Sequence, residues 1–395
     1  MSNFSETDAK TDAIISSMNT MSILQGLQRL SESLQKMDDR ITVPPKHYRD
    51  IPEDIQKSYG LMMQGASLVH ATSTKYTLVG KISLDEQETV AQDLLKGCQF
   101  IAAGALVIAD ESFGCCRSTR MHTKRACRAV IVTVTQLVEA FHEAAEGHNN
   151  STSAATAALL EKDNNLAAQK CGAVWSTCDV FLQKKVPQGN RNAMRRDLFT
   201  WMMECNETMA EFQEMIDRGP STGLLTTATT ICEGNDEATD EDSFDDFLQD
   251  DNEQYTAFEL EIAKPCVAMV KCSRGTINVA LKASECAGDL IKQCTPGEDT
   301  QARILQWIGN VHDKARHVGE GMTDLGTLLY PTLSIEDIES QGNKQHDAIL
   351  AVLEYILDTT DMELSDEVVD MATKLRAVAQ TRHDEMTKAI AAARQ

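Results

Sequence analysis

Apolar residues recur at helical spacing along nearly the whole chain. Near the N-terminus they step by three or four positions from Ile14 to Met37, and segment after segment repeats this spacing. The spacing matches the 3.6-residue turn of an α-helix, whereas a half-buried strand alternates with a period of two. The stretch 130–134 is β-branched, which favours a strand, but its apolar neighbours keep helical spacing. The pattern predicts an all-α chain in which 130–134 is buried helix.

Prolines, glycines and polar turns divide this pattern into separate long helices. In the first half we expect helices at 8–39, 52–76, 83–114, 116–146, 152–184 and 190–218. In the second half we expect them at 258–287, 295–319, 335–341, 343–359 and 365–395, with Pro265 either kinking the first of these or marking its start. Long helices joined by short turns describe antiparallel bundles. Because 395 residues are too many for one core of ordinary size, two bundles are expected.

An acidic segment interrupts the helical pattern. Between Glu233 and Glu253 there are eleven acidic residues and no basic ones, which supply −11 of the net charge of −23. Such a segment has too little apolar content to fold by itself. The predicted architecture is therefore two antiparallel helical bundles, residues 1–225 and 255–395, joined by an acidic flexible linker, residues 226–254.

The acidic segment contains a candidate partner-binding motif, in which two aromatic residues and a leucine lie among carboxylates. Its residues are Ser243, Phe244, Asp245, Asp246, Phe247 and Leu248. Acidic neighbours keep such apolar groups exposed, so that they can dock into a partner's groove. Thr239 and Ser243 each have an acidic residue three positions on, which suits phosphorylation by an acidophilic kinase. The alternative is a plain solvated linker.

A second candidate is a basic stripe near the start of the fourth expected helix. Its members share one helix face and are Arg117, Arg120, Lys124 and Arg128, with Arg125 beside them. On so acidic a chain, this stripe suggests a surface that receives an acidic segment, either this chain's own or a partner's. The alternative is a solvated face whose cations pair with local carboxylates.

The first expected helix carries a leucine-rich seam. Leu27, Leu30, Leu34 and Met37 follow a heptad-like spacing, which is typical of helix dimerisation and also of core packing within one bundle. We expect truncation of core residues, such as Leu30→Ala or Trp175→Ala, to cost roughly 2–5 kcal/mol of folding free energy.

The sequence offers no catalytic constellation. The segment His142–Glu146 resembles a zinc-protease helix but has glutamate where the second histidine is needed, and neither a P-loop nor a nucleophile elbow occurs. We therefore predict no enzyme activity, no cofactor and no metal site. The acidic balance disfavours nucleic-acid binding. The sequence contains no uninterrupted apolar run of about 18 residues, so we expect no membrane-spanning helix. The twelve cysteines, without a secretory signal, are expected to be reduced core thiols of a cytoplasmic or nuclear protein.

A series of landmarks resembles a known family. They are Val174-Trp175, the turn from Pro187 to Asn192, Ser221–Leu225, Lys264–Val270 and Leu328–Pro331. Their order and spacing are similar to those of the cyclin-D-binding protein family, also called GCIP or the Maid homologue, over roughly residues 90–395. The resemblance implies an all-α two-domain regulator, found in nucleus and cytoplasm, that binds D-type cyclins and inhibitory helix-loop-helix proteins. It carries no single functional residue onto this chain.

Two classes of function follow. The first is a non-enzymatic interaction protein that regulates cell-cycle progression and transcription. The second is a cytoskeletal or scaffold adaptor of the vinculin or α-catenin type, because long antiparallel helices with alanine-rich packing fit that class as well.

Overall fold

The structure is a computed structural model that describes residues 21–37, 44–79, 84–148, 155–220, 254–294, 299–359 and 362–394. These residues form helices and turns and contain no strand, so the all-α prediction is confirmed. The chain divides into two compact units, Met1–Arg196 (unit 1) and Asp197–Gln395 (unit 2). This division lies within a helix, whereas the sequence analysis predicted that the first bundle ends at residue 225. The predicted linker, residues 226–254, lies outside the described residues except for Gln254.

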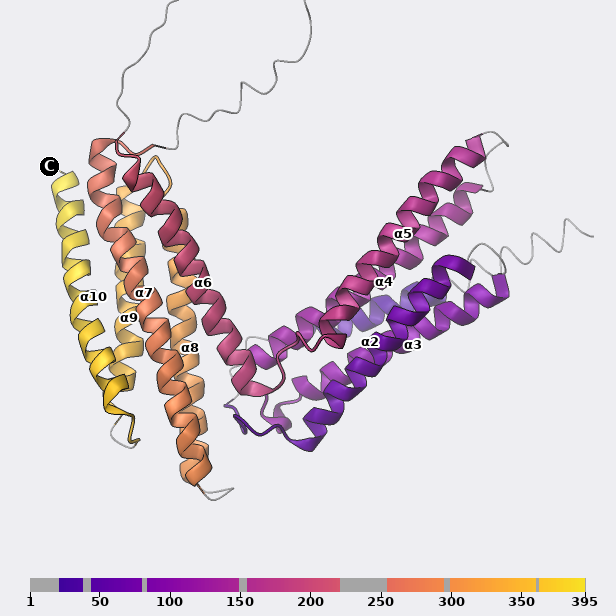
Figure 1. The fold of residues 1–395 in the computed structure, drawn as a ribbon, viewed down its shortest axis with the longest axis horizontal. Coiled ribbons are helices and arrows are strands. Elements are labelled where there is room, and N and C mark those ends of the chain that lie inside the picture. Colours follow the sequence, from indigo (N-terminus) through magenta and orange to yellow (C-terminus); the bar gives the residue numbers. More distant parts are fainter. Residues whose placement is uncertain are drawn as a thin grey trace, which may run out of the picture. The chain divides into compact units, whose positions relative to one another are not determined.

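Unit 1 is built around a ring of four helices. They are α2 (Glu53–Val79), α3 (Leu84–Ala109), α4 (Arg117–His148) and α5 (Ala155–Leu182), with the 3-10 turn η1 (Glu111–Phe113) between α3 and α4. Helix α2 packs against α3, α3 against α4, α4 against α5, and α5 returns to α2, as the indigo to magenta ribbons show (Figure 1). The ring encloses one apolar core that includes Val130, Ile131 and Val134, so this β-branched stretch is helix as predicted, with Val132 on its exposed face.

Helices α2 and α3 approach each other through glycines. A Cβ atom on Gly65 would lie 2.6 Å from the carbonyl oxygen of Gly97, and one on Gly104 would lie 2.7 Å from that of Ser58. Both distances are shorter than any real contact, so these positions require glycine for the two backbones to meet.

Helix α3 contains a long apolar stretch. Its stretch Thr89–Ala109 is long and apolar enough to cross a membrane by length and composition, and 50% of this window is buried inside the bundle. The core helix of a bundle passes the same test of length and composition, so the expectation of no membrane-spanning helix stays a prediction.

The leucine-rich seam belongs to the core of unit 1. Residues 21–35 are helical, Leu27 and Leu34 are fully buried, and Leu30 packs against the same cluster from a half-buried position. Core packing, rather than a free dimerisation seam, accounts for these residues. Trp175 was wrongly expected in the core: it is 39% exposed and stacks on His70, with 5.7 Å between ring centroids.

Unit 2 contains a second ring of four helices, with a fifth alongside. The ring is α7 (Ala257–Leu290), α8 (Asp299–Thr327), α9 (Ile335–Leu357) and α10 (Asp366–Ala393), and the 3-10 turn η3 (Ile291–Gln293) follows α7. Helix α6 (Gly189–Asp217) starts in unit 1 and continues in unit 2, where Trp201 packs on His312 and Gly319 of α8. Figure 1 shows α7 to α10 side by side in orange and yellow.

The start of α7 is fixed by a capping box that the sequence analysis did not identify. Thr256 Oγ1 accepts a hydrogen bond from the Glu259 backbone N–H at 3.2 Å, and the Glu259 carboxylate accepts one from the Thr256 N–H at 2.9 Å. Glu259 also accepts from the Leu333 N–H at 2.9 Å, which joins α7 to the turn before α9. Pro265 therefore lies inside the helix and does not mark its start.

Two predicted helix boundaries in unit 2 are wrong for one physical reason. Helix α8 continues past Gly319 to Thr327, and the expected break at Gly342 is absent because α9 is continuous. A Cβ atom on Gly319 would lie 2.5 Å from the Trp201 ring, and one on Gly342 would lie 2.5 Å from the Met386 methyl group. These glycines serve close helix packing and do not end helices.

Candidate interaction surface

The two predicted interaction motifs have different outcomes. The acidic set lies outside the described residues and stays a prediction: Thr239, Ser243, Phe244, Asp245, Asp246, Phe247 and Leu248. The basic stripe lies in the first three turns of α4, and the structure places each of its members.

The basic stripe is less exposed than a solvated helix face. Arg120 is buried, with 3% of its surface exposed, while Arg117, Lys124 and Arg128 are half-buried and Arg125 is exposed. The Lys124 ammonium donates a hydrogen bond to the Met37 carbonyl at 2.7 Å and so binds the end of the N-terminal helical stretch. The stripe is thus partly built into the frame of unit 1.

Asn190, at the start of α6, is the centre of that frame. Its side chain is fully buried and makes four hydrogen bonds. Its Oδ1 accepts from the Cys116 N–H at 2.8 Å and the Thr119 hydroxyl at 2.9 Å. Its Nδ2 donates to the carbonyls of His47 at 2.8 Å and Gly114 at 3.0 Å. One amide therefore ties together the segment before α2, the start of α4 and the start of α6.

Further hydrogen bonds brace the same end of unit 1. The Tyr59 hydroxyl donates to the Pro187 carbonyl and accepts from the Gly189 N–H, both at 3.2 Å. The Arg191 N–H donates to the Tyr48 carbonyl at 3.2 Å. Gly189 has φ +76°, a left-handed conformation that favours glycine, and a side chain there would meet Ile51.

The segments held by Asn190 are strongly basic. We call residues 44–50, 110–128 and 183–196 the basic end of unit 1; they contain twelve Lys and Arg against three Asp and Glu, a net charge of +9 in a chain of −23. Its exposed cations are Lys46, Arg125, Lys184, Lys185 and Arg196. The sequence analysis found only the α4 members, because Arg49, Arg191 and Arg195 are brought near them only by the fold.

Two ionisable groups buried beneath this surface, His47 and Cys115, are held in their neutral forms. Burial lowers the pKa of His47 to about 4, so the imidazole is uncharged at neutral pH. Burial raises the pKa of the Cys115 thiol to about 12, with a smaller contribution in the same direction from Cys116 and an opposing one from Arg120. A thiol held protonated in this way is a poor nucleophile, so this site has a structural role.

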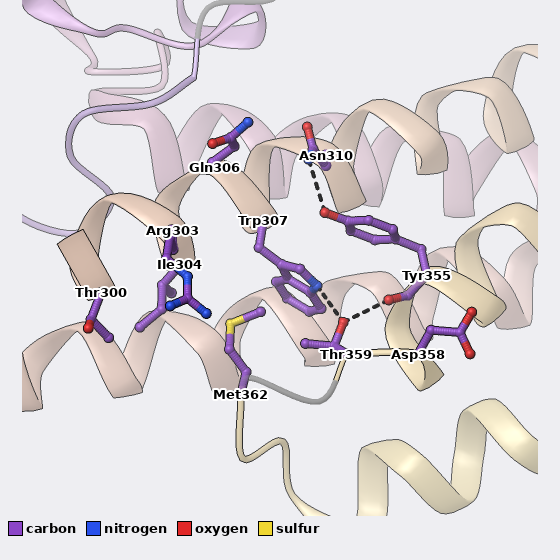
Figure 2. Close-up of a pocket in the computed structure, with 10 residues that line it drawn as sticks. All are labelled: Thr300, Arg303, Ile304, Gln306, Trp307, Asn310, Tyr355, Asp358, Thr359 and Met362. Carbon is purple, nitrogen blue, oxygen red and sulfur yellow. Dashed lines mark hydrogen bonds between the residues drawn. The ribbon is translucent and has the colours of Figure 1, made fainter.

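Unit 2 contains a cavity of about 380 Å³ between the first turns of α8 and the end of α9. In Figure 2 the Trp307 and Tyr355 rings form its wall, with Arg303 and Met362 nearby. The Trp307 indole N–H donates to Thr359 Oγ1 at 2.8 Å, and Asn310 Nδ2 donates to the Tyr355 hydroxyl at 2.9 Å. These two hydrogen bonds link α8 to α9 and to the residues that follow it, which is a structural role.

Metal-ligand groups do not converge in the part of the chain that the structure describes. No set of three or more His, Cys, Asp or Glu side chains among those residues could hold a metal ion. All eleven described cysteines are free thiols and nine of them are buried, in keeping with the predicted reduced core thiols.

Comparison with known proteins gives one match. Residues 62–218 match the family model described as Grap2 and cyclin-D-interacting, N-terminal. No curated protein matches the chain in a sequence search. The matched residues run from α2 to the end of α6 and include Val174-Trp175, the turn at 187–192, the α4 stripe and Asn190. Three of the five landmarks, at 221–225, 264–270 and 328–331, lie beyond the match. Residues 62–218 are therefore similar to the N-terminal domain of the Grap2 and cyclin-D-interacting family, which confirms over this range the resemblance seen in the sequence.

Proposed function

We propose that this protein regulates cell-cycle progression and transcription by binding other proteins, with D-type cyclins and helix-loop-helix proteins as its partners, in both cytoplasm and nucleus. The observation that carries the proposal is the family match over residues 62–218, because the family's description names cyclin-D interaction. Its matched range contains most of the basic end, a charged surface suited to contacts between macromolecules.

The ionisable groups support a non-enzymatic role. His47 and Cys115 of unit 1 are held neutral, and in the unit 2 cavity Trp307 donates to Thr359 and Asn310 to Tyr355. A catalytic site needs a nucleophile or base poised near its working pH and open to substrate. Binding is the activity that this arrangement supports best.

A pull-down with purified partners tests the proposal. The full chain is immobilised and offered a D-type cyclin and, separately, an inhibitory helix-loop-helix protein. We expect saturable retention of both. Retention of neither partner, by protein whose circular dichroism shows the expected helix content, would remove the proposed function.

An adaptor role is the second candidate, and the bundles of long helices in both units favour it. Cosedimentation with actin filaments distinguishes the two roles. Sedimentation of the chain with filaments, together with no retention of cyclin, would favour the adaptor.

A further inference from the structure

We propose that the basic end of unit 1 is a docking surface for an Asp- and Glu-rich segment of a partner protein. The inference rests on the proposed function and names the chemistry of the partner segment that the domain recognises. It is carried by three observations: the sign of the local charge, the frame that holds the cations, and the kind of cation present.

The local charge is opposite to that of the whole chain. Forty residues in three segments carry +9, while the full chain carries −23. An acidic partner segment is attracted to this end and repelled by the rest of the surface, so the field orients it as it approaches. Complementary charge of this kind raises the association rate and selects the partner more than it adds affinity.

The cations stand on a frame that is assembled before any partner arrives. The buried Asn190 amide connects the three segments through four hydrogen bonds of 2.8–3.0 Å. Lys46 is held as well, because its N–H donates to the Gly114 carbonyl at 3.0 Å and its ammonium to the Ser112 carbonyl at 3.0 Å. A preorganised surface loses less conformational entropy on binding than one that must be ordered.

The chemistry of the cations fits carboxylates. Two of the five exposed cations are arginines, Arg125 and Arg196, and the other three are lysines. A guanidinium donates two parallel hydrogen bonds to one carboxylate, a geometry that lysine lacks. A nucleic-acid duplex also carries anions, but the net charge of −23 repels a long polyanion, whereas a short peptide can contact the basic end alone.

Fluorescence anisotropy with the full chain tests the docking surface. The probe is a labelled short peptide of alternating Asp and Glu, and its Asn and Gln counterpart is the neutral control. The test variant carries Arg125→Glu, Lys184→Glu and Lys185→Glu, three exposed positions of the basic end that take no part in the Asn190 frame. The matched variant carries Lys271→Glu, Lys344→Glu and Lys388→Glu, three exposed lysines of unit 2, so both variants change the net charge equally.

We expect the acidic peptide to bind the wild-type chain with an affinity that falls as salt rises, and the neutral peptide not to bind. Reversing the three cations of the basic end should weaken binding by roughly tenfold or more, since each reversal replaces an attraction by a repulsion of similar size. The matched variant should stay within about twofold of wild type, because it leaves every cation of the basic end in place.

Three results of the peptide experiment would overturn the inference: no binding of the acidic peptide, an equal loss in both triple variants, or tighter binding of a duplex oligonucleotide than of the peptide at the same salt. The pull-down with D-type cyclin separates this outcome from failure of the proposed function. If cyclin is retained equally by the wild type and the basic-end variant, the docking surface is wrong and the proposed function stands. If the acidic peptide binds as expected but neither partner is retained, the docking surface stands and the proposed function is wrong.

Discussion

Replacing Asn190 with alanine tests whether one buried amide holds the basic end together. The substitution removes four hydrogen bonds at a fully buried position. Two of the four groups that bond to the amide have another hydrogen-bonding contact: the Thr119 hydroxyl lies 3.3 Å from the Cys116 thiol, and the Gly114 carbonyl also accepts from the Lys46 N–H. The Cys116 N–H and the His47 carbonyl lose their bonds to the amide.

Each of these two buried groups costs about 1–3 kcal/mol when its hydrogen bond is removed. We therefore expect Asn190→Ala to lower the free energy of unfolding of unit 1 by roughly 4 kcal/mol, a large part of the stability of a typical domain. Urea denaturation followed by circular dichroism gives the magnitude. Amide hydrogen exchange, measured on peptides that cover 44–50 and 111–123, assigns the loss to the frame. The variant should also lose binding of the acidic peptide, because the cations no longer share a fixed frame.

Asn192→Ala is the matched control. Asn192 lies two positions further along α6, is exposed, and donates one hydrogen bond to the Gln188 carbonyl at 2.9 Å. Its truncation should cost less than about 1 kcal/mol. If Asn190→Ala costs no more than Asn192→Ala, or leaves exchange at 44–50 unchanged, the amide does not organise this end of the unit.

Three further predictions concern stability. Burial lowers the pKa of His47 from 6.5 to about 4, so between these pH values the unfolded chain takes up a proton there and the folded chain does not. The free energy of unfolding of unit 1 should therefore fall by about 2 kcal/mol between pH 7.5 and pH 5 because of this residue. Urea denaturation of His47→Gln at the two pH values should lack this part of the fall. Lys184 has φ +53° where α5 ends, so Lys184→Gly should raise stability by about 1 kcal/mol in a thermal melt; a lower melting temperature would contradict the assigned strain. In α2, a Cβ atom added at Gly60 would have no atom within 4 Å, whereas one added at Gly65 would lie 2.6 Å from the Gly97 carbonyl oxygen. Gly60→Ala should therefore stabilise the fold by up to about 1 kcal/mol, and Gly65→Ala should destabilise it by about 1–3 kcal/mol. Equal melting temperatures of the two variants would contradict the packing of α2 on α3.

Helical periodicity was enough to predict the helices, and it failed where glycine has two roles. The spacing of apolar residues reports which face is buried, so the extents of most helices could be predicted within a few residues. Gly319 and Gly342 look like helix ends in a sequence because glycine weakens helices. Only their neighbours in space, Trp201 and Met386, show that they allow close packing.

The candidate surface was predicted only in its local part. Four cations on one face of α4 are visible in the sequence, but Arg49, Arg191 and Arg195 lie far away along the chain and no local pattern connects them. The depth of each cation was not predictable either. Arg120 is 3% exposed because it lies where α4 meets the Asn190 frame, although arginine is usually a surface residue.

The Asn190 frame has only a faint sequence signal. A Gly-Asn pair after a proline is ordinary turn chemistry, and the sequence analysis treated it as a stop between helices. What makes Asn190 different is that its amide reaches two carbonyls, one N–H and one hydroxyl from distant segments, which is a property of the folded unit alone.

Equilibrium titration of the full chain with a purified D-type cyclin is the decisive measurement. We expect saturable binding that weakens with salt and is reduced in the Arg125→Glu, Lys184→Glu, Lys185→Glu variant but not in its unit 2 counterpart. Absence of saturable binding by a correctly folded chain would contradict the claim that this protein acts through contact with such a partner.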